Sequence, residues 1–316
     1  MISELYDLLK KSYNLVTILG PTAGGKTSFA TNLAYLMNSE IISADSRQVY
    51  KGMDLGTGKD IEDFFIYEKA IPYHLIDIVD AGEKYNLFQF QKDFFNAFKK
   101  ISAKNKMPLM CGGTGLYLEA IVENYDLTEV PVNEKLREEL ENKSLPELTA
   151  ILQSYKDLHN STDIDTKKRA IRAIEIAVFI EKNQVVKPNY PKVSSFNIGI
   201  KFDRESQKRR ITQRLDERLK EGMIEEVQTL LKKGISPETL IYYGLEYKYV
   251  TQYLLNEYSF EEMREKLNIA IHQFSKRQMT WFRRMEKKGV KIWWLDGHSS
   301  AEEKINRVQQ IIKKAS

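Results

Sequence analysis

The clearest chemical signal in the chain is a glycine-rich segment at residues 20–27, which fits the phosphate-loop pattern GxxxxGK[ST]. It follows the apolar run at residues 15–19, typical of a buried strand, and precedes a helical pattern that ends near Met37. Glycines let backbone N–H groups point inward, the next helix adds the positive end of its dipole, and Lys26 adds a full charge. The segment predicts a site for at least two linked phosphates, with an ordinary strand-to-helix turn as the plainer alternative.

Two more polar segments follow predicted strands. Asp45 and Gln48 come just after the apolar run at residues 40–43, and Thr114 lies in a glycine-rich turn after the run at 108–111. The carboxyl ends of parallel strands meet at one edge of a sheet, so we expect all three segments to face one cleft. There a carboxylate can accept a proton, a hydroxyl can bridge to a substrate amine, and Gln48 can read a base edge. The alternatives are a helix cap at Asp45, a surface position for Gln48 and a tight turn around Thr114.

Arginine recurs every four residues at Arg210, Arg214 and Arg218, so a helix would place all three on one face. Guanidinium groups match phosphate oxygens, which favours an anionic ligand there. The alternative is a solvated face whose arginines pair with the nearby acids Asp216 and Glu217.

A second basic cluster, residues 276–284, interleaves lysine and arginine with Trp281 and Phe282. The basic character continues to Lys291 against one acid, Glu286. Such a mixture favours a surface for an RNA backbone and an unstacked base. The alternative places Trp281 and Phe282 in the core, with the charges merely flanking them.

The elements that must position these residues follow a β-α-β-α order through the first third of the chain. The expected strands lie at residues 15–19, 40–43, 74–79, 108–111, 195–202 and 292–295, and the first helices near 27–37 and 87–100. This order predicts an α/β fold with a P-loop NTPase-like, mostly parallel sheet flanked by helices. Charged helical segments at 124–191 predict an inserted helical domain, which leaves 1–123 and 192–316 as the catalytic core with its C-terminal helices.

The composition is that of an ordinary globular protein, with 316 residues, 42% of them hydrophobic, and a net charge of +4. So mild a basic excess does not by itself predict nucleic-acid binding. Cys111 is the only cysteine, which excludes an internal disulfide and suggests a small buried residue. The chain shows no segment of signal-peptide type and no uncharged apolar run of about 18 residues. We therefore expect a cytoplasmic monomer without a membrane span.

Taken together, these motifs resemble the tRNA dimethylallyltransferase (tRNA isopentenyltransferase) family in its bacterial form. The matching segments span almost the whole chain in family order, at residues 20–27, 42–50, 52–57, 74–77, 112–118, 169–175 and 276–283. The combination of DSRQVY, GGTGLYL and KRQxTWFR is highly specific, whereas the phosphate loop alone would not separate this family from kinases and other nucleotide enzymes.

The resemblance implies transfer of a dimethylallyl group from dimethylallyl diphosphate to N6 of adenosine 37, next to the tRNA anticodon, with release of diphosphate. It implies that Asp45 accepts the proton of the adenine amine with help from Thr114, that Arg214 stabilises the departing diphosphate, and that Thr27 contacts a Mg²⁺ cofactor. The implied diphosphate-binding residues are Gly20, Thr22, Ala23, Gly24, Gly25, Lys26 and Thr27. The implied tRNA-binding residues are Asp45, Ser46, Arg47, Gln48, Lys168, Arg169, Arg172, Lys276, Arg277, Gln278 and Arg283, with the insertion as a tRNA-binding domain.

Two segments depart from the family pattern. After the Gly-Thr pair at residues 56–57 the family usually has Ala-Lys-Pro, whereas this chain has Gly58, Lys59 and Asp60, which predicts another path for the following loop. Before Arg169 the family often has His-Pro-Asn-Asp, whereas residues 159–165 read HNSTDID. The second departure leaves the tRNA contacts of the insertion open.

Other functions compete with this interpretation. An adenylate isopentenyltransferase would use free adenine nucleotides as acceptors, but a mononucleotide needs neither the insertion nor the basic C-terminal segment. A P-loop phosphotransferase would use the loop for ATP. An RNA-binding module would retain the loop without any catalysis.

Overall fold

The computed structural model describes residues 7–155, 164–183 and 188–315. The chain divides into two compact units, one made of residues 1–125 and 191–316 and the other of residues 126–190. The second unit falls within the helical insertion expected at 124–191. Among the described ranges, no helix combines the length and the apolar character needed to cross a membrane.

The larger unit is built on a six-stranded sheet in the order β5-β2-β6-β1-β7-β8, in which every neighbouring pair is parallel. The strands are β1 Leu15–Leu19, β2 Ile41–Ser43, β5 Tyr73–His74, β6 Leu109–Gly112, β7 Ser195–Lys201 and β8 Ile292–Asp296. Because β1, β2 and β6 run in the same direction, the polar segments that follow them emerge at one edge of the sheet. The predicted α/β class with a parallel sheet is confirmed.

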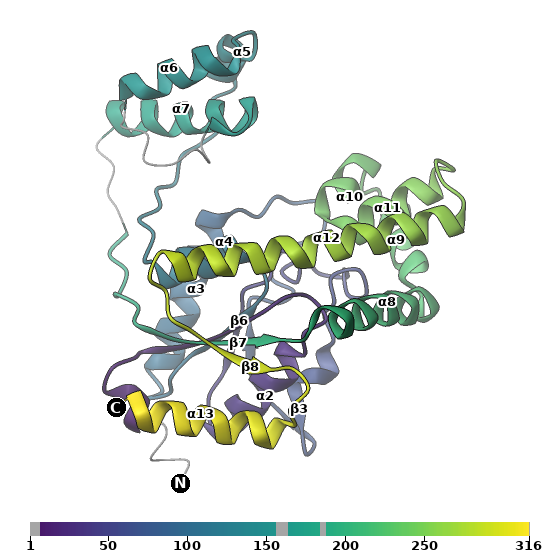
Figure 1. Ribbon diagram of the computed structural model, residues 1–316. Helices are drawn as coiled ribbons and strands as arrows, with labels where there is room; N and C mark the ends of the chain where they lie inside the picture. Colours follow the sequence, from purple (N-terminus) through teal and green to yellow (C-terminus); the bar gives the residue numbers. More distant parts are fainter. Residues whose placement is uncertain (1–6, 156–163, 184–187, 316) are drawn as a thin grey trace. The chain divides into compact units, whose positions relative to one another are not determined.

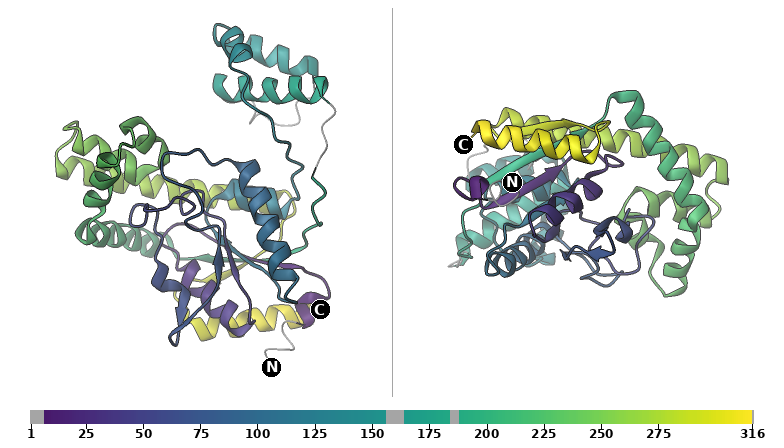
Figure 2. Two further views of the ribbon diagram at one scale, coloured as in Figure 1. Left: turned by 180° about the vertical axis from the view of Figure 1, so that it is seen from behind. Right: turned by 90° about the horizontal axis from the view of Figure 1, so that it is seen from below.

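Helices cover both faces of this sheet. The helices are α2 Lys26–Leu36, α3 Leu87–Ser102, α4 Gly115–Val122, α12 Phe260–Lys287 and α13 Ala301–Ala315. Figure 1 and the view from behind in Figure 2 show α12 on one side of the sheet and α13 on the other. Val16 and Ile18 of β1 alternate with residues of the opposite face and share a core with Phe29 and Leu33 of α2. This packing fixes the position of the loop between β1 and α2.

The prediction of a strand at residues 74–79 is wrong beyond His74, where β5 ends. Leu75 and Asp77 adopt left-handed backbone conformations, with φ of 63° and 54°, which no continuous strand can contain. Only a single parallel bridge, between Tyr50 and Val79, follows. Upstream, η1 Ile61–Phe64 and a two-stranded hairpin of β3 Phe65–Ile66 and β4 Lys69–Ala70 precede β5.

The C-terminal helices form a second core beside the sheet. They are α8 Arg204–Glu221, α9 Met223–Lys232, α10 Pro237–Tyr243 and α11 Leu245–Leu254, which pack with α12. Buried side chains from these helices surround Val49, Tyr50 and Met53 of the loop after β2. That loop is thereby attached to the helices as well as to the sheet.

The smaller unit consists of α5 Glu134–Glu141, α6 Leu145–Tyr155 and α7 Lys167–Lys182. Leu148 and Leu152 of α6 pack on Ala170 and Ile174 of α7 in a small core of its own. The side chain of Glu175 is almost fully buried in this unit and binds Arg137 through two hydrogen bonds of 3.0 Å. The charged helices that the sequence predicts there therefore have an internal ionic contact.

Candidate active site

The phosphate loop, residues 20–27, joins the end of β1 to the first turn of α2. Gly20 lets β7 pass close by, since a Cβ atom there would lie 2.4 Å from the carbonyl oxygen of Ile200. Ala23 and Gly25 adopt left-handed conformations, with φ of 56° and 69°. These turns curl the chain at the N-terminus of α2, where residues 23–27 line a cavity of about 350 Å³.

Side chains of helix α8 donate hydrogen bonds to carbonyl groups of the phosphate loop. Gln207 Nε2 donates to the Thr22 carbonyl at 2.7 Å, and Arg210 Nε donates to the Ala23 carbonyl at 2.9 Å. Lys26 Nζ donates to the Pro21 carbonyl at 2.7 Å. Within the described residues, the backbone N–H groups of residues 23–25 have no acceptor. These donors, together with the dipole of α2, suit an anionic ligand.

The charge of Lys26 is poorly compensated. Burial is the largest influence on the pKa of Lys26, and with Arg214 it outweighs the opposite effects of Cys111 and Asp45, so the pKa falls to about 8. An anion bound beside a buried ammonium stabilises its charged form. The lowered pKa therefore favours a phosphate-binding role for the lysine.

Cys111 lies at the end of β6, and 7% of its surface is exposed. Burial raises the pKa of its thiol to about 12. A thiol that stays protonated at neutral pH is a poor nucleophile. The expectation of a small buried residue is confirmed.

Asp45 and Thr114 line one cavity of about 410 Å³ together with Lys26 and Arg214. Asp45 Oδ1 accepts a hydrogen bond of 2.9 Å from the Arg47 N–H, which holds the carboxylate in a local turn. Thr114 Oγ1 accepts one of 3.0 Å from the Ser46 N–H. Asp45 and Thr114 are therefore connected through Ser46, and no described residue donates a hydrogen bond to Asp45 Oδ2.

In the second glycine turn, residues 112–115, each glycine lies close to another part of the protein, while Gly112, Gly113 and Thr114 also line the 410 Å³ cavity. A Cβ atom on Gly112 would lie 2.3 Å from the Ala44 carbonyl oxygen, one on Gly113 2.6 Å from Gln278 Nε2, and one on Gly115 2.5 Å from the Trp281 ring. The glycines thus let α12 and the segment after β2 approach the turn. The tight-turn alternative describes them better than close approach of a substrate.

Gln278 is buried and binds both glycine-rich segments, which differs from the tRNA contact predicted for it. Its Oε1 accepts from the Thr22 N–H at 2.8 Å, and its Nε2 donates to the Gly113 carbonyl at 2.8 Å. Its side chain is 6% exposed and has one hydrogen bond at each end of its amide, so it joins the two segments, and its contact with tRNA stays a prediction. The same bond occupies the Thr22 N–H, so this N–H is not one of the open donors of the phosphate loop.

Gln48 also has both ends of its amide engaged. Its Oε1 accepts from Ser43 Oγ at 2.9 Å, and its Nε2 donates to the Gly58 carbonyl at 3.0 Å. In this arrangement it joins the end of β2 to the following loop while it also lines the 410 Å³ cavity, and its reading of a base edge stays a prediction. Arg47 is more accessible and donates to the Tyr242 carbonyl at 3.1 Å, with its guanidinium 5.6 Å from the Tyr242 ring centre.

The arginines of α8 do not pair with Asp216 or Glu217. Asp216 instead binds Arg264 through two contacts of 2.7 Å. Arg214 and Arg218 both reach Asp60, at 2.8 Å and 2.9 Å. The face predicted for an anion therefore holds a carboxylate of the protein itself.

Part of the wall of the 410 Å³ cavity is apolar. Ile241, Leu245, Ile271 and Phe274 contribute this part. They come from α10, α11 and α12, whose helical patterns carry no individual mark of a ligand pocket. Sequence reasoning missed these residues and Asp60, because only the folded chain brings them to the strand ends.

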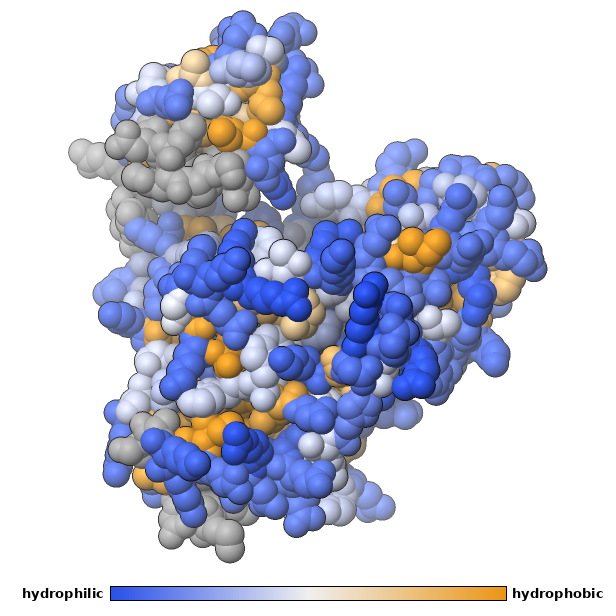
Figure 3. Space-filling model, viewed as in Figure 1, coloured by the Kyte–Doolittle hydropathy of each residue, from blue (hydrophilic) through white to orange (hydrophobic). Residues whose placement is uncertain are grey.

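Helix α12 carries the aromatic residues and the cations of the second basic cluster. Phe282 is fully buried and Trp281 packs on Gly115, with the Arg284 guanidinium 4.0 Å from its ring centre. The core alternative is therefore correct for Phe282, whereas Trp281 is only partly buried. The side chains of Lys276, Arg277 and Arg283 are exposed on α12, and Figure 3 shows hydrophilic side chains along this helix.

The basic residues of α7 lie in the smaller unit and have different partners. Lys168 is exposed, and Arg169 pairs with Asp165 at 2.7 Å. Arg172 binds the buried carboxylate of Glu175 and donates to the Val130 carbonyl at 2.8 Å. Its guanidinium helps to hold the unit together, which differs from the free tRNA contact predicted for it. The departure at residues 159–165 lies mostly outside the described residues.

Comparisons with known proteins agree with this geometry. The chain matches the family models described as IPP transferase, at residues 48–285, and Isopentenyl transferase, at residues 13–67. The tRNA dimethylallyltransferase 2 of Bacteroides fragilis is 57% identical over 95% of this chain and 98% of its own length. The protein of the same name from Phocaeicola vulgatus is 55% identical, over 96% of this chain and 98% of its own.

Solved structures show the same likeness. The tRNA isopentenylpyrophosphate transferase of Bacillus halodurans aligns with a TM-score of 0.70 and 31% identity, over 96% of each chain. A eukaryotic dimethylallyltransferase acting on tRNA aligns with a TM-score of 0.76 over 95% of this chain and 78% of its own, and at 23% identity it supports the fold alone. On these matches, the chain belongs to the tRNA dimethylallyltransferase family of prenyltransferases.

Proposed function

We propose that this chain transfers the dimethylallyl group of dimethylallyl diphosphate to N6 of adenosine 37 in tRNA and releases diphosphate. One observation carries the proposal: a single cavity is lined by Lys26 and Thr27 of the phosphate loop, by Arg214 and by the carboxylate of Asp45. A base and a set of diphosphate donors that face the same space suit attack by an amine on a carbon bonded to a diphosphate.

Asp45 is the proposed base. As N6 of the adenine forms its bond to C1 of the dimethylallyl group, the bond between C1 and the diphosphate oxygen breaks and the amine loses a proton. An exocyclic aromatic amine is a weak nucleophile, so a carboxylate that takes this proton lowers the barrier. Thr114, held by the Ser46 N–H at 3.0 Å, orients the amine beside Asp45.

The phosphate loop and Arg214 are the proposed stabilisers of the leaving group. Negative charge grows on the diphosphate as its bond to carbon breaks, and fixed donors around it need no reorganisation at that moment. The open N–H groups of residues 23–25, Lys26 and Arg214 supply these donors.

The residues of the cavity fit a Mg²⁺ ion. The Thr27 hydroxyl and the Asp63 carboxylate line the same 350 Å³ cavity as the phosphate loop. Mg²⁺ prefers oxygen ligands and is usually completed by substrate phosphates and water. When bound, the ion would supply positive charge to the diphosphate.

The apolar residues Ile241, Leu245, Ile271 and Phe274 are the proposed wall around the dimethylallyl group, because they line the same cavity as Asp45 and Lys26. An apolar wall also keeps water from competing with the amine for the activated carbon.

Exposed cations are the proposed tRNA contacts, with Lys276, Arg277 and Arg283 on α12, Arg47 at the cavity and Lys168 and Arg169 on α7. The adenine must leave its stack to reach Asp45, at a general cost of a few kcal/mol. We also propose that the enzyme works as a monomer in the cytoplasm.

The test is incubation of the full chain with dimethylallyl diphosphate, Mg²⁺ and unmodified tRNAs that carry adenosine 37, followed by mass spectrometry of the tRNA nucleosides. We expect N6-prenylated adenosine, and the absence of product with several such tRNAs would overturn the proposal. Prenylation of AMP offered in place of tRNA would identify an adenylate isopentenyltransferase. Phosphoryl transfer from ATP without a prenyl donor would identify a phosphotransferase. Binding of tRNA without any product identifies an RNA-binding module.

A further inference from the structure

Asp60 lies between two arginines that face the phosphate loop. Its Oδ2 is 2.8 Å from Arg214 Nη2 and its Oδ1 is 2.9 Å from Arg218 Nη2. All three side chains line the 350 Å³ cavity together with residues 23–27. The carboxylate therefore uses guanidinium hydrogens that a phosphate in this cavity would also use.

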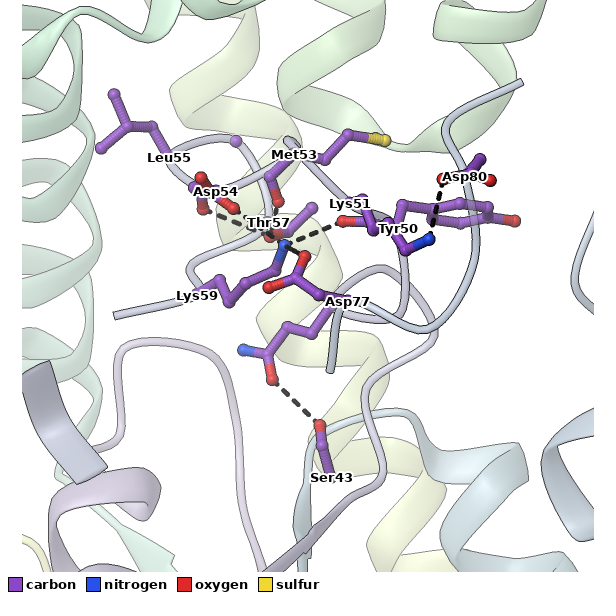
Figure 4. Close-up of polar contacts among 12 residues, drawn as sticks. Ser43, Tyr50, Lys51, Met53, Asp54, Leu55, Thr57, Lys59, Asp77 and Asp80 are labelled. Carbon is purple, nitrogen blue, oxygen red and sulfur yellow. Dashed lines mark hydrogen bonds and ion pairs between the residues drawn. The ribbon is translucent and has the colours of Figure 1, made fainter. Parts of the chain in front are cut away.

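The neighbouring residue fixes the position of Asp60. Figure 4 shows the buried ammonium of Lys59 with three oxygen acceptors around it. These are the Tyr50 carbonyl and Asp54 Oδ1, both at 2.8 Å, and Asp77 Oδ1 at 2.5 Å. Because the side chain of Lys59 is 0% exposed, moving it would leave a buried charge without its partners.

Helix α9 holds the same loop from another side. Glu226 accepts hydrogen bonds from the backbone N–H groups of residues 54–56, at 2.8, 2.8 and 3.1 Å. At Gly58 the backbone has φ of 72°, and a Cβ atom would lie 2.5 Å from Arg214 Nη2. The loop is thus shaped to let Arg214 approach and to direct Asp60 at the arginines.

The carboxylate is charged and only half enclosed. Burial favours the neutral form, but Arg218 and Arg214 outweigh it and hold the pKa of Asp60 below its usual value. The side chain of Asp60 is 45% exposed, whereas that of Arg218 is 9% exposed. Asp60 therefore borders solvent, whereas Arg214, which is 29% exposed, and Arg218 are more enclosed.

We infer that Asp60 is a positioning residue that competes with the diphosphate for Arg214 and Arg218. This inference rests on the proposed function, since it assigns the cavity to the donor diphosphate. Before the donor binds, Asp60 holds the guanidinium groups in place; when the donor binds, phosphate oxygens replace the carboxylate. After transfer, the return of the carboxylate helps to expel the product diphosphate, at the expense of affinity for the donor.

The test measures binding of inorganic pyrophosphate to the full chain by calorimetry, with and without Mg²⁺, for wild type and Asp60→Asn. We expect about three- to tenfold tighter binding by the variant in both conditions, because a repelling charge is removed while a polar side chain of similar size remains. Glu62→Gln is the matched control, since it removes the same charge from an exposed residue of η1 and should leave the affinity unchanged. Asp60→Glu keeps the carboxylate and should stay near wild type.

The outcomes separate this inference from the function. If wild type binds no pyrophosphate in either condition, the proposed diphosphate site itself fails. If wild type binds it and Asp60→Asn binds equally or more weakly, Asp60 is a structural support for the arginines and the inference alone is overturned. A loss of pyrophosphate affinity in Asp60→Asn that occurs only with Mg²⁺ would make Asp60 a metal ligand. This result would also contradict competition between Asp60 and the diphosphate.

Steady-state kinetics supplies a readout that a structural role would not move. In Asp60→Asn we expect the KM for the donor and the inhibition constant of pyrophosphate to fall by a similar factor. A rise in both would contradict the inference. The melting temperatures of Asp60→Asn and Glu62→Gln should be compared, so that a fall in active protein is not taken for a change in affinity.

Discussion

The two glycine-rich segments of the larger unit follow neighbouring parallel strands, yet they use their glycines differently. In the phosphate loop, a Cβ atom on Gly25 would meet no protein atom within 4 Å, and the N–H groups of residues 23–25 stay open. In the second glycine turn, Ala44, Gln278 and Trp281 fill the space that side chains would take. Gly25 therefore leaves room for a ligand, whereas the glycines of the second turn, like Gly20 of the phosphate loop, leave room for the rest of the protein.

This difference assigns the two segments to opposite ends of the proposed reaction. The phosphate loop is the proposed binding site of the leaving diphosphate. The second turn carries Thr114, which binds the backbone next to Asp45 and so supports the base. Glycine content alone does not distinguish a binding loop from a packing turn; the identity of the neighbouring atoms does.

The largest effect is expected from Asp45→Asn, which removes the base beside the second turn and leaves the phosphate loop intact. We expect single-turnover prenylation to fall about 10²- to 10⁴-fold, because general base catalysis is lost. Binding of tRNA and of pyrophosphate should stay within about twofold of wild type if the two segments are independent.

Asp80→Asn is the control for Asp45→Asn, since Asp80 is an exposed acid that pairs with Lys51 at 3.0 Å. It should retain full activity. Near-normal turnover of Asp45→Asn would exclude Asp45 as the base and remove the division of roles between the two segments.

Alanine substitutions at Gly113 and Gly25 compare the two segments directly. Gly113→Ala should lower the free energy of unfolding by about 3 kcal/mol, because its Cβ would displace the Gln278 amide and leave buried groups without partners. Gly25→Ala should cost only about 1 kcal/mol for the left-handed backbone, yet it should weaken pyrophosphate binding more than Gly113→Ala does. Chemical denaturation and calorimetry measure the two quantities, and equal losses of stability would break the comparison.

A smaller change is expected from Lys26→Ala, which acts on the phosphate loop alone. Loss of a charged donor should weaken pyrophosphate binding about 10- to 100-fold. Affinity for tRNA should change little. Lys51→Ala, which removes an exposed lysine from outside the cavity, is the matched control and should leave pyrophosphate binding unchanged. A similar loss of tRNA affinity in Lys26→Ala would show that the loop does not act on the diphosphate alone.

The smallest effect is a dependence on pH that belongs to the phosphate loop. Lys26 has a pKa lowered to about 8, so its charge is present below that pH and lost above it. The KM for the donor should therefore rise by up to about tenfold between pH ~7 and pH ~9, and Lys26→Arg should make the profile flatter because arginine stays charged. An unchanged slope in Lys26→Arg would assign the titration to another group.

Local sequence was enough to predict the core of the fold and the three polar segments at the strand ends. The apolar runs at β1, β2, β6 and β8 are short, as those of buried parallel strands are, and β7 alternates between polar and apolar residues; strand direction then brings the residues that follow the strands together. The prediction of a strand at residues 74–79 failed beyond His74 because Leu75 and Asp77 take left-handed conformations. The ion pair of Lys59 with Asp77 helps to maintain them. A partner 18 positions away is not visible in hydrophobic spacing.

Side-chain roles were harder to predict than element positions. Gln48, Arg172 and Gln278 have the residue types of RNA-contacting groups, but each is engaged within the protein by partners that the chain brings from elsewhere. Asp60 was visible only as a departure from a family pattern, and its partners lie more than 150 residues later. Charge and polarity indicate what a side chain can bind, whereas topology determines what it does bind.

The bridge made by Gln278 has a consequence for the order in which this protein is completed during synthesis. Thr22 and Gln278 are 256 positions apart, so a nascent chain has made most of its length before the Thr22 N–H can receive its acceptor. Until then this N–H and the Gly113 carbonyl lack their partner, and leaving each unsatisfied inside a folded core would cost about 1–3 kcal/mol. The phosphate loop therefore acquires this hydrogen bond only after Gln278 has been made.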